Sequence, residues 1–215
     1  MRLFKHVLLI FCAFFLNLDS GLQATPIDLT VTSGGFAVSD PAFVSFGPDN
    51  NDAVLTEDEL RGLTWLSNDP FLGDPGIAVS LNASNLTFDL AFSTSGNDSF
   101  EVKLLDATGG APLFSLFHDG DALGAGSFFY DNVNIDLVLL NLTGDTIGLD
   151  FSLVSGFTDS TVDAVLTIAN VSINETLTPI PEPSTRLLAC LGIVALIGHM
   201  RKETLYTRNT RHNRC

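Results

Sequence analysis

The residues best suited to chemistry are oxygen-bearing side chains that follow Gly47. Five of them lie within ten residues: Asp49, Asn51, Asp52, Glu57 and Asp58. Calcium takes six to eight oxygen ligands, so this segment is a candidate calcium site. It is not an EF-hand loop, because Val54 stands where that loop needs its turn glycine. Calcium is the one cofactor that the sequence suggests.

Catalytic groups are scarce between residues 25 and 180. His118 is the only histidine there, and the three cysteines stand at positions 12, 190 and 215. Neither a Cys–His pair nor a multi-His zinc site can form in this region. Two carboxylates could make a glycoside hydrolase, but the sequence does not single out a pair among 22 acids. We therefore predict a protein that is not an enzyme.

Two aromatic side chains, Trp65 and Tyr130, suit stacking on sugar rings if they are exposed in a groove. Together with the acidic segment, they make a carbohydrate- or calcium-binding surface module the alternative function. Most of the 17 Phe residues fall on apolar faces of expected strands, so we expect them in the core.

The charge distribution excludes one class of partner. Between residues 25 and 180 the only cations are Arg61 and Lys103, and the net charge there is about −20. Phosphate backbones are bound mainly through Lys and Arg and would be repelled by this region. We expect no binding to nucleic acid.

The same region alternates apolar and polar side chains with a period of two, most clearly over 86–92, 133–139 and 147–153. This pattern is typical of half-buried antiparallel strands. Further strands are expected at 27–32, 42–46, 77–81, 100–105, 113–118, 127–130 and 162–173. About ten short strands predict a mainly β protein, a single antiparallel β-sandwich that is jelly-roll-like or immunoglobulin-like.

One helical turn is expected among these strands, at residues 56–62. Thr56 and Glu59 have the spacing of a capping box, and Gly62 is placed to end the helix.

Residues 1–24 are typical of a secretory signal peptide. Arg2 and Lys5 precede the apolar run 7–16, and Ala24 fits a small-residue cleavage site. Ten apolar residues are too few to span a bilayer core of about 30 Å.

The last 35 residues, 181–215, form a second targeting segment. Pro181, Glu182 and Pro183 open the stretch 181–185, and their prolines predict an extended, accessible backbone. The apolar run 187–200 is an expected transmembrane helix, and the basic tail 201–215 should stay in the cytoplasm.

This order resembles the PEP-CTERM sorting signal of exported bacterial proteins. The resemblance places Pro181, Glu182 and Pro183 in the sorting motif and Arg201 and Lys202 in the basic stop. It implies processing near the motif by exosortase, a membrane cysteine protease. The alternatives are a plain bitopic tail and a glycolipid anchor signal, although that signal normally ends with its apolar segment.

These observations predict three parts: a signal peptide (1–24), an exported β-sandwich domain (25–180) and a sorting signal (181–215). The expected function is that of an exported, non-catalytic envelope or extracellular-matrix protein. It would cross the bacterial inner membrane, be anchored transiently and then reach the envelope or the exterior. Extracellular polysaccharide is a candidate partner of its acidic surface.

Overall fold

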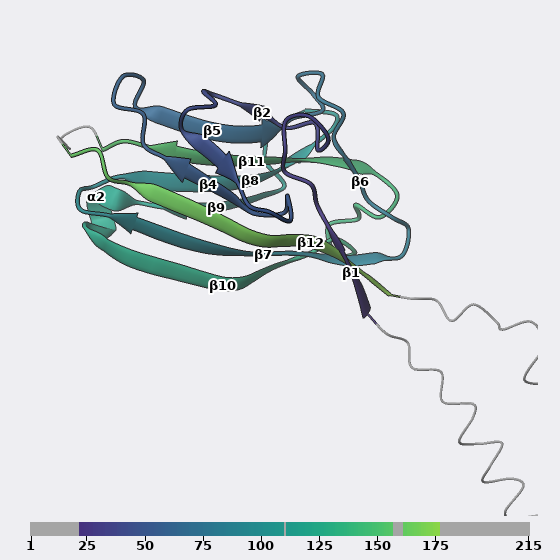
Figure 1. The fold of residues 1–215 in the computed structure, drawn as a ribbon. Coiled ribbons are helices and arrows are strands. Elements are labelled where there is room, and N and C mark those ends of the chain that lie inside the picture. Colours follow the sequence, from purple (N-terminus) through teal and green to yellow (C-terminus); the bar gives the residue numbers. More distant parts are fainter. Residues whose placement is uncertain (1–21, 110, 157–160, 177–215) are drawn as a thin grey trace, which may run out of the picture. The chain divides into compact units, whose positions relative to one another are not determined.

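The structure, a computed structural model, describes residues 22–109, 111–156 and 161–176 (Figure 1). All of them belong to one compact unit, Leu22–Thr176. The predicted sorting motif, the apolar run 187–200 and the basic stop lie outside the described residues. Within these residues no helix is long and apolar enough to cross a membrane.

Six strands form the first sheet, sheet A. Its order is β10-β7-β12-β4-β3, and β1 pairs with the end of β12. The bounds are β1 (Leu22–Pro26), β3 (Val44–Phe46), β4 (Ala53–Thr56), β7 (Ala83–Thr94), β10 (Gly126–Asp136) and β12 (Val165–Thr176).

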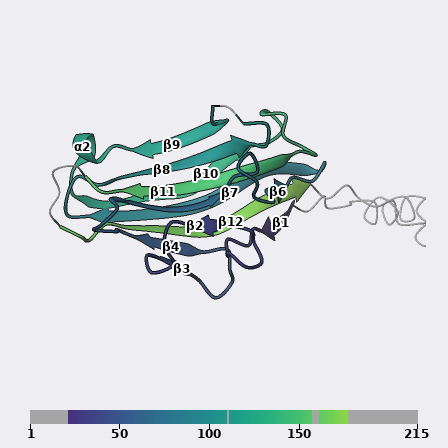
Figure 2. The ribbon, with the colours of Figure 1, turned by 90° about the horizontal axis from the view of Figure 1, so that it is seen from above.

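Six further strands form sheet B. Its order is β2-β5-β11-β8-β9, and β6 pairs with the start of β11. The bounds are β2 (Ala37–Val38), β5 (Leu63–Asn68), β6 (Ile77–Ala78), β8 (Ser99–Asp106), β9 (Phe114–His118) and β11 (Thr146–Val154). The short helix α2 (Gly120–Leu123) joins β9 to β10. Figure 2 shows β9, β8 and β11 side by side.

The pairing of the longer strands is nested along the chain. β8 pairs with β9, β7 with β10, β5 with β11 and β4 with β12, always antiparallel. The chain thus folds back on itself as one long double ribbon whose pairs alternate between the two sheets. This arrangement is that of a jelly roll, and the predicted antiparallel β-sandwich is confirmed.

Alternation along the strands builds the core between the sheets. In β11, for example, Ile147, Leu149, Phe151 and Leu153 are buried, while Asp150 and Ser152 between them are only half-buried. The same alternation in β7 buries Leu86, Phe88, Leu90 and Phe92. Both strands therefore contribute one apolar face to the core and one more polar face to the outside.

The predicted helical turn at residues 56–62 is wrong in its cap and its extent. Thr56 is the last residue of β4, and its N–H and hydroxyl both donate to the carbonyl of Phe43. The turn after it is capped by Asp58, whose Oδ1 accepts from the N–H groups of Leu60 and Arg61. Strand pairing thus takes the backbone groups that a capping box would have used.

Several strand predictions differ in their bounds. The stretch predicted at 127–130 and the first four residues of the one predicted at 133–139 form one strand, β10, whose pairing with β7 shifts register between Tyr130 and Val133. Residues 137–139 form a turn instead, in which the Leu139 N–H donates to Asp136 Oδ1 and the Leu139 side chain is exposed. Asn132 has a positive φ of 53° there and donates its N–H to Asp89 Oδ1. The strand predicted at 27–32 is replaced by a turn, because Asp28 accepts hydrogen bonds from Thr30 and Ser33.

His118 closes the sandwich at the edge formed by β9 and β10. Its side chain is fully buried and lies between Phe92, Phe100 and Phe128, with ring centroids 4.3–5.3 Å away. Nδ1 lies 2.9 Å from the Tyr130 hydroxyl, and Nε2 has no hydrogen-bond partner among the described residues. Burial lowers the pKa of His118 below its usual 6.5. This histidine is part of the core.

We expect His118 to make the domain less stable in mild acid. Because its folded-state pKa is lowered, only the unfolded chain gains a proton as the pH falls below about 6.5. The midpoint of urea unfolding of residues 22–176 should therefore be lower at pH 5 than at pH 7. The double variant His118→Phe/Tyr130→Phe replaces the polar pair by apolar rings and should lose most of this difference. An equal pH dependence in the variant would contradict this role of His118.

Candidate functional site

The outer face of sheet B carries a group of polar and aromatic side chains that the core does not use. In β8, Phe100, Val102 and Leu104 are fully buried, so Glu101 and Lys103 point outward. In β9, Phe114 and Leu116 pack on the core, so Ser115 and Phe117 point outward. The same alternation turns Trp65 and Ser67 of β5 and Asp150 and Ser152 of β11 away from the core.

The strand register arranges these eight side chains in two rows across the sheet. The first row is Trp65, Ser152, Glu101 and Phe117; the second is Ser67, Asp150, Lys103 and Ser115. Adjacent strands lie about 4.8 Å apart, so the first row spans roughly 14 Å from backbone to backbone. We call these eight residues the sheet B platform.

The two ends of the first row are aromatic. Phe117 on β9 has 57% of its surface exposed, although it is a large apolar side chain. Trp65 on β5 is half-buried, and its backbone is held by Ser39, whose Oγ accepts from the Trp65 N–H and whose N–H donates to the Trp65 carbonyl. The rings therefore stand on fixed strands at both ends of a polar stretch.

Charged side chains occupy the middle of the platform and hold one another in place. Lys103 Nζ lies 2.6 Å from Glu101 Oε2, and Ser115 Oγ donates to Glu101 Oε1 at 2.9 Å. Both carboxylate oxygens of Glu101 thus have a partner. The hydroxyl of Ser152 donates to the backbone carbonyl of Glu101 at 3.3 Å.

Asp150 lies beside Lys103 in the second row. Burial raises the pKa of the Asp150 carboxyl above its usual 3.8, and Lys103 offsets part of that rise. The like charges of Glu101 and Asp69 raise this pKa further. The ionised carboxylate is therefore held at a cost in stability, as is common for groups that serve a ligand.

The loop after β5 brings Asp69 to this face. It crosses β11 at Gly148, where an added Cβ would lie 2.4 Å from the Asn68 carbonyl oxygen and 2.7 Å from Pro70 Cδ. Only glycine permits this approach, and the loop forms one border of the platform.

The residues of the predicted calcium site are not brought together. Asp49, Asn51 and Asp52 lie before β4, and Glu57 and Asp58 lie after it, separated by about 13 Å of strand. Glu57 Oε2 accepts from the backbone N–H groups of Asp163 and Ala164. Within the described ranges, no three His, Cys, Asp or Glu side chains are grouped so that they could hold a metal ion.

The two residues predicted to stack on sugar rings lie in different parts of the structure. Trp65 lies on the platform, but Tyr130 is half-buried against the core, where it contacts His118 and Phe100. The second platform ring is Phe117, which the sequence does not single out from the phenylalanines expected mostly in the core. The alternation of Phe114, Leu116 and His118 on one side of β9 would have placed Phe117 on the other.

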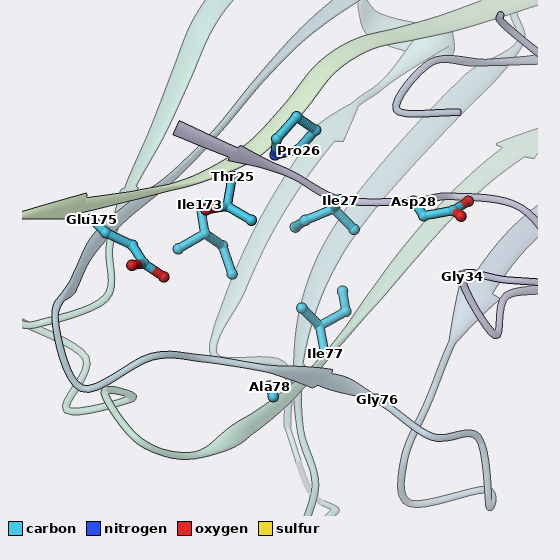
Figure 3. Close-up of a pocket in the computed structure, with 10 residues that line it drawn as sticks. All are labelled: Thr25, Pro26, Ile27, Asp28, Gly34, Gly76, Ile77, Ala78, Ile173 and Glu175. Carbon is cyan, nitrogen blue, oxygen red and sulfur yellow. The ribbon is translucent and has the colours of Figure 1, made fainter. Parts of the chain in front are cut away.

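A concavity separate from the platform opens between the sheets, at the edge formed by β1 and β6 (Figure 3). It has a volume of about 240 Å³, and Ile27, Ile77 and Ile173 are apolar residues in its lining. Of its two carboxylates, Asp28 is occupied by Thr30 and Ser33, which leaves Glu175. The sheet B platform brings more polar groups together than this concavity, with three ionisable side chains and three serine hydroxyls on one face.

The residue at the predicted signal cleavage site lies in β1. Ala24 pairs with Asn174 of β12, and all five side chains of β1 are exposed. The first three residues of β1 therefore contribute backbone pairing and no buried side chain.

No protein-family model and no curated protein matches the chain. Among solved structures, a non-crystalline cellulose specific carbohydrate-binding module, CBM28, is 14% identical with a TM-score of 0.39, covering 70% of this chain and 94% of that one. A CBM4 structure is 13% identical with a TM-score of 0.31, covering 74% and 90%. The enzymatically active domain of tailspike protein 4 of bacteriophage CBA120 is 15% identical with a TM-score of 0.34, covering 75% of this chain and 20% of that one. TM-scores below 0.4 carry no argument about ligand or activity.

The position of Asp150 predicts a gain in stability when its charge is removed. Because its pKa is raised in the folded state, the domain loses stability as the pH rises through that pKa. The variant Asp150→Asn should therefore unfold at a higher urea concentration than the original domain at pH 7. Near pH 3.5 both carry an uncharged side chain, and the difference should vanish. A less stable variant at pH 7 would show that the charge of Asp150 supports the fold.

Proposed function

We propose that the chain is an exported, non-catalytic surface protein whose β-sandwich binds carbohydrate on the sheet B platform. The observation that carries this proposal is the row Trp65, Ser152, Glu101 and Phe117, with an aromatic ring at each end. Sugar rings present C–H groups on their faces and hydroxyl groups around their edges. Aromatic rings suit the former, and carboxylates and hydroxyls suit the latter.

The length and rigidity of the platform support a chain-like ligand. A row of roughly 14 Å across four paired strands is long enough for a short oligosaccharide that lies across the strand direction. The side chains stand on strands rather than on loops, so little ordering is needed when a ligand binds.

The pair Glu101 and Asp150 supports binding better than hydrolysis. In a glycoside hydrolase one carboxylate must be free to activate water or attack the sugar. Glu101 is engaged by Lys103 on one oxygen and by Ser115 on the other. These contacts leave it suited to hold a hydroxyl group in place.

Export and sorting complete the proposal. Cleavage after Ala24 would remove the first three residues of β1, whose side chains are exposed, so the core would be left intact. The segment 181–215, with Pro181, Glu182, Pro183, Arg201 and Lys202, would then direct the domain to an exosortase and to the envelope or matrix. A polysaccharide-binding domain would be useful at that location.

The binding proposal predicts that both platform rings are needed. Affinity electrophoresis of residues 22–176 against a panel of soluble polysaccharides should find a retarding glycan. Trp65→Ala and Phe117→Ala should each weaken that binding by roughly tenfold or more, the effect of losing a central aromatic contact. Phe129→Ala is the matched control, since Phe129 is a 71% exposed phenylalanine on β10 of the other sheet. Equal binding by all four proteins, or release of reducing ends from the glycan, would contradict the proposal.

The sorting proposal predicts the ends of the mature chain. In a host with an exosortase, the intact mass should correspond to a chain that starts at Thr25 and ends near Pro181. Glu182→Ala should abolish the C-terminal processing, because the acid lies in the motif. Glu203→Ala removes an acid from the basic tail and should be processed normally. A C-terminus at Cys215 in the original protein would instead indicate a plain membrane anchor.

A further inference from the structure

The sheet B platform carries more negative than positive charge. Its ionisable groups are Glu101, Asp150 and Lys103, and Asp69 lies close enough to raise the pKa of Asp150. Two carboxylates thus accompany one ammonium, and the platform has a net negative charge whenever Asp150 is ionised. A glycan that carries carboxylate or sulfate groups would meet like charge there.

The single cation of the platform is already neutralised. Lys103 Nζ contacts Glu101 Oε2 at 2.6 Å and also attracts Asp150 on the neighbouring strand. A uronate carboxylate bound at Lys103 would be the third carboxylate around one ammonium. Arg61, the other cation between residues 25 and 180, is paired with Asp40 and Asp58 and lies before β5.

Lys103 also supplies the positive charge that a bridging metal ion would bring. Acidic polymers can be held on acidic surfaces by divalent cations that lie between two sets of carboxylates. On the platform the lysine ammonium lies 2.6 Å from Glu101 Oε2, and its charge acts on Asp150 of the neighbouring strand. A cation of the chain itself thus takes part of the role that a metal ion would have there.

We infer that the ligand of the sheet B platform is a neutral polysaccharide, without carboxylate or sulfate groups, bound without a divalent cation. The inference rests on the proposed carbohydrate-binding function and narrows its ligand class. Neutral sugar hydroxyls can donate to the carboxylates of Glu101 and Asp150 and to the hydroxyl oxygen of Ser115, and they can accept from the hydroxyl of Ser67. Such hydrogen bonds to charged groups are among the stronger ones available to an uncharged ligand.

The experiment compares neutral and uronic acid polymers on the full-length chain, in a non-ionic detergent without a sugar headgroup. The neutral probes are soluble β-glucan, mannan and xylan, and the acidic probes are polygalacturonate and alginate. Affinities are measured at 0.05 M and 0.5 M NaCl, each with EDTA and with calcium. We expect at least one neutral probe to bind at least tenfold more tightly than either acidic probe at low salt, equally well in EDTA and in calcium.

Two charge variants test whether the selection is local. Glu101→Gln leaves Lys103 without its close partner and should raise the affinity for polygalacturonate by about tenfold. Glu59→Gln removes the same charge from the exposed turn after β4 and should leave the affinities for polygalacturonate and for the neutral probes unchanged. Glu59 is not a platform residue, and any long-range effect of its charge should be screened further at 0.5 M NaCl than at 0.05 M.

The outcomes separate this inference from the proposed function. Binding of a uronic acid polymer as tight as that of every neutral probe, or binding that EDTA abolishes, would overturn the inference and leave carbohydrate binding standing. An equal gain in affinity for polygalacturonate in Glu101→Gln and Glu59→Gln would likewise overturn the inference, because the net charge of the protein, and not the charge of the platform, would then determine which glycan binds. Failure of every polymer to bind the original protein would overturn the proposed function, and the inference with it.

Discussion

The register of β11 between β5 and β8 determines which side chains share the outer face of sheet B. Phe151 pairs with Leu66 and Val102, and all three point into the core, so Ser152 must stand between Trp65 and Glu101 on the other side. A slip of one residue would bury Asp150 and Ser152 and expose Phe151. The apolar core thus enforces the geometry of the platform, although no platform residue belongs to it.

The same constraint explains why charged groups can stand close together there. Glu101 and Asp150 stand on strands whose inner faces are fully buried, so their backbones cannot move apart to relieve the repulsion between the two carboxylates. Burial and the neighbouring carboxylates raise the pKa of Asp150, which indicates that its ionised form destabilises the fold. Sites that bind ligands often carry such a cost, because the groups are arranged for the ligand rather than for the fold.

Much of the fold could be predicted from alternation alone. The runs 86–92 and 147–153 lie within β7 and β11 with the expected faces inward, because each alternates without interruption. The turn at residues 56–62 could not be predicted in the same way, since the partner of Thr56 is Phe43, thirteen residues earlier. Only one of the two platform rings could be predicted from the sequence. Trp65 was singled out by its residue type, but Phe117 is recognised as a platform residue only from its pairing with Glu101, when β9 lies beside β8. The calcium candidates lie on both sides of β4, because residues that are close in sequence are separated in space when a strand runs between them.

Trp65 is the only tryptophan of the chain, so its fluorescence reports on the platform directly. The most direct test titrates the protein with the neutral polysaccharide that it retains best and follows Trp65 emission together with quenching by acrylamide. Saturable protection of Trp65 from the quencher, lost in Phe117→Ala and kept in Phe129→Ala, is the predicted result. Tight binding of the glycan that leaves the emission and quenching of Trp65 unchanged would place the ligand elsewhere and contradict the account.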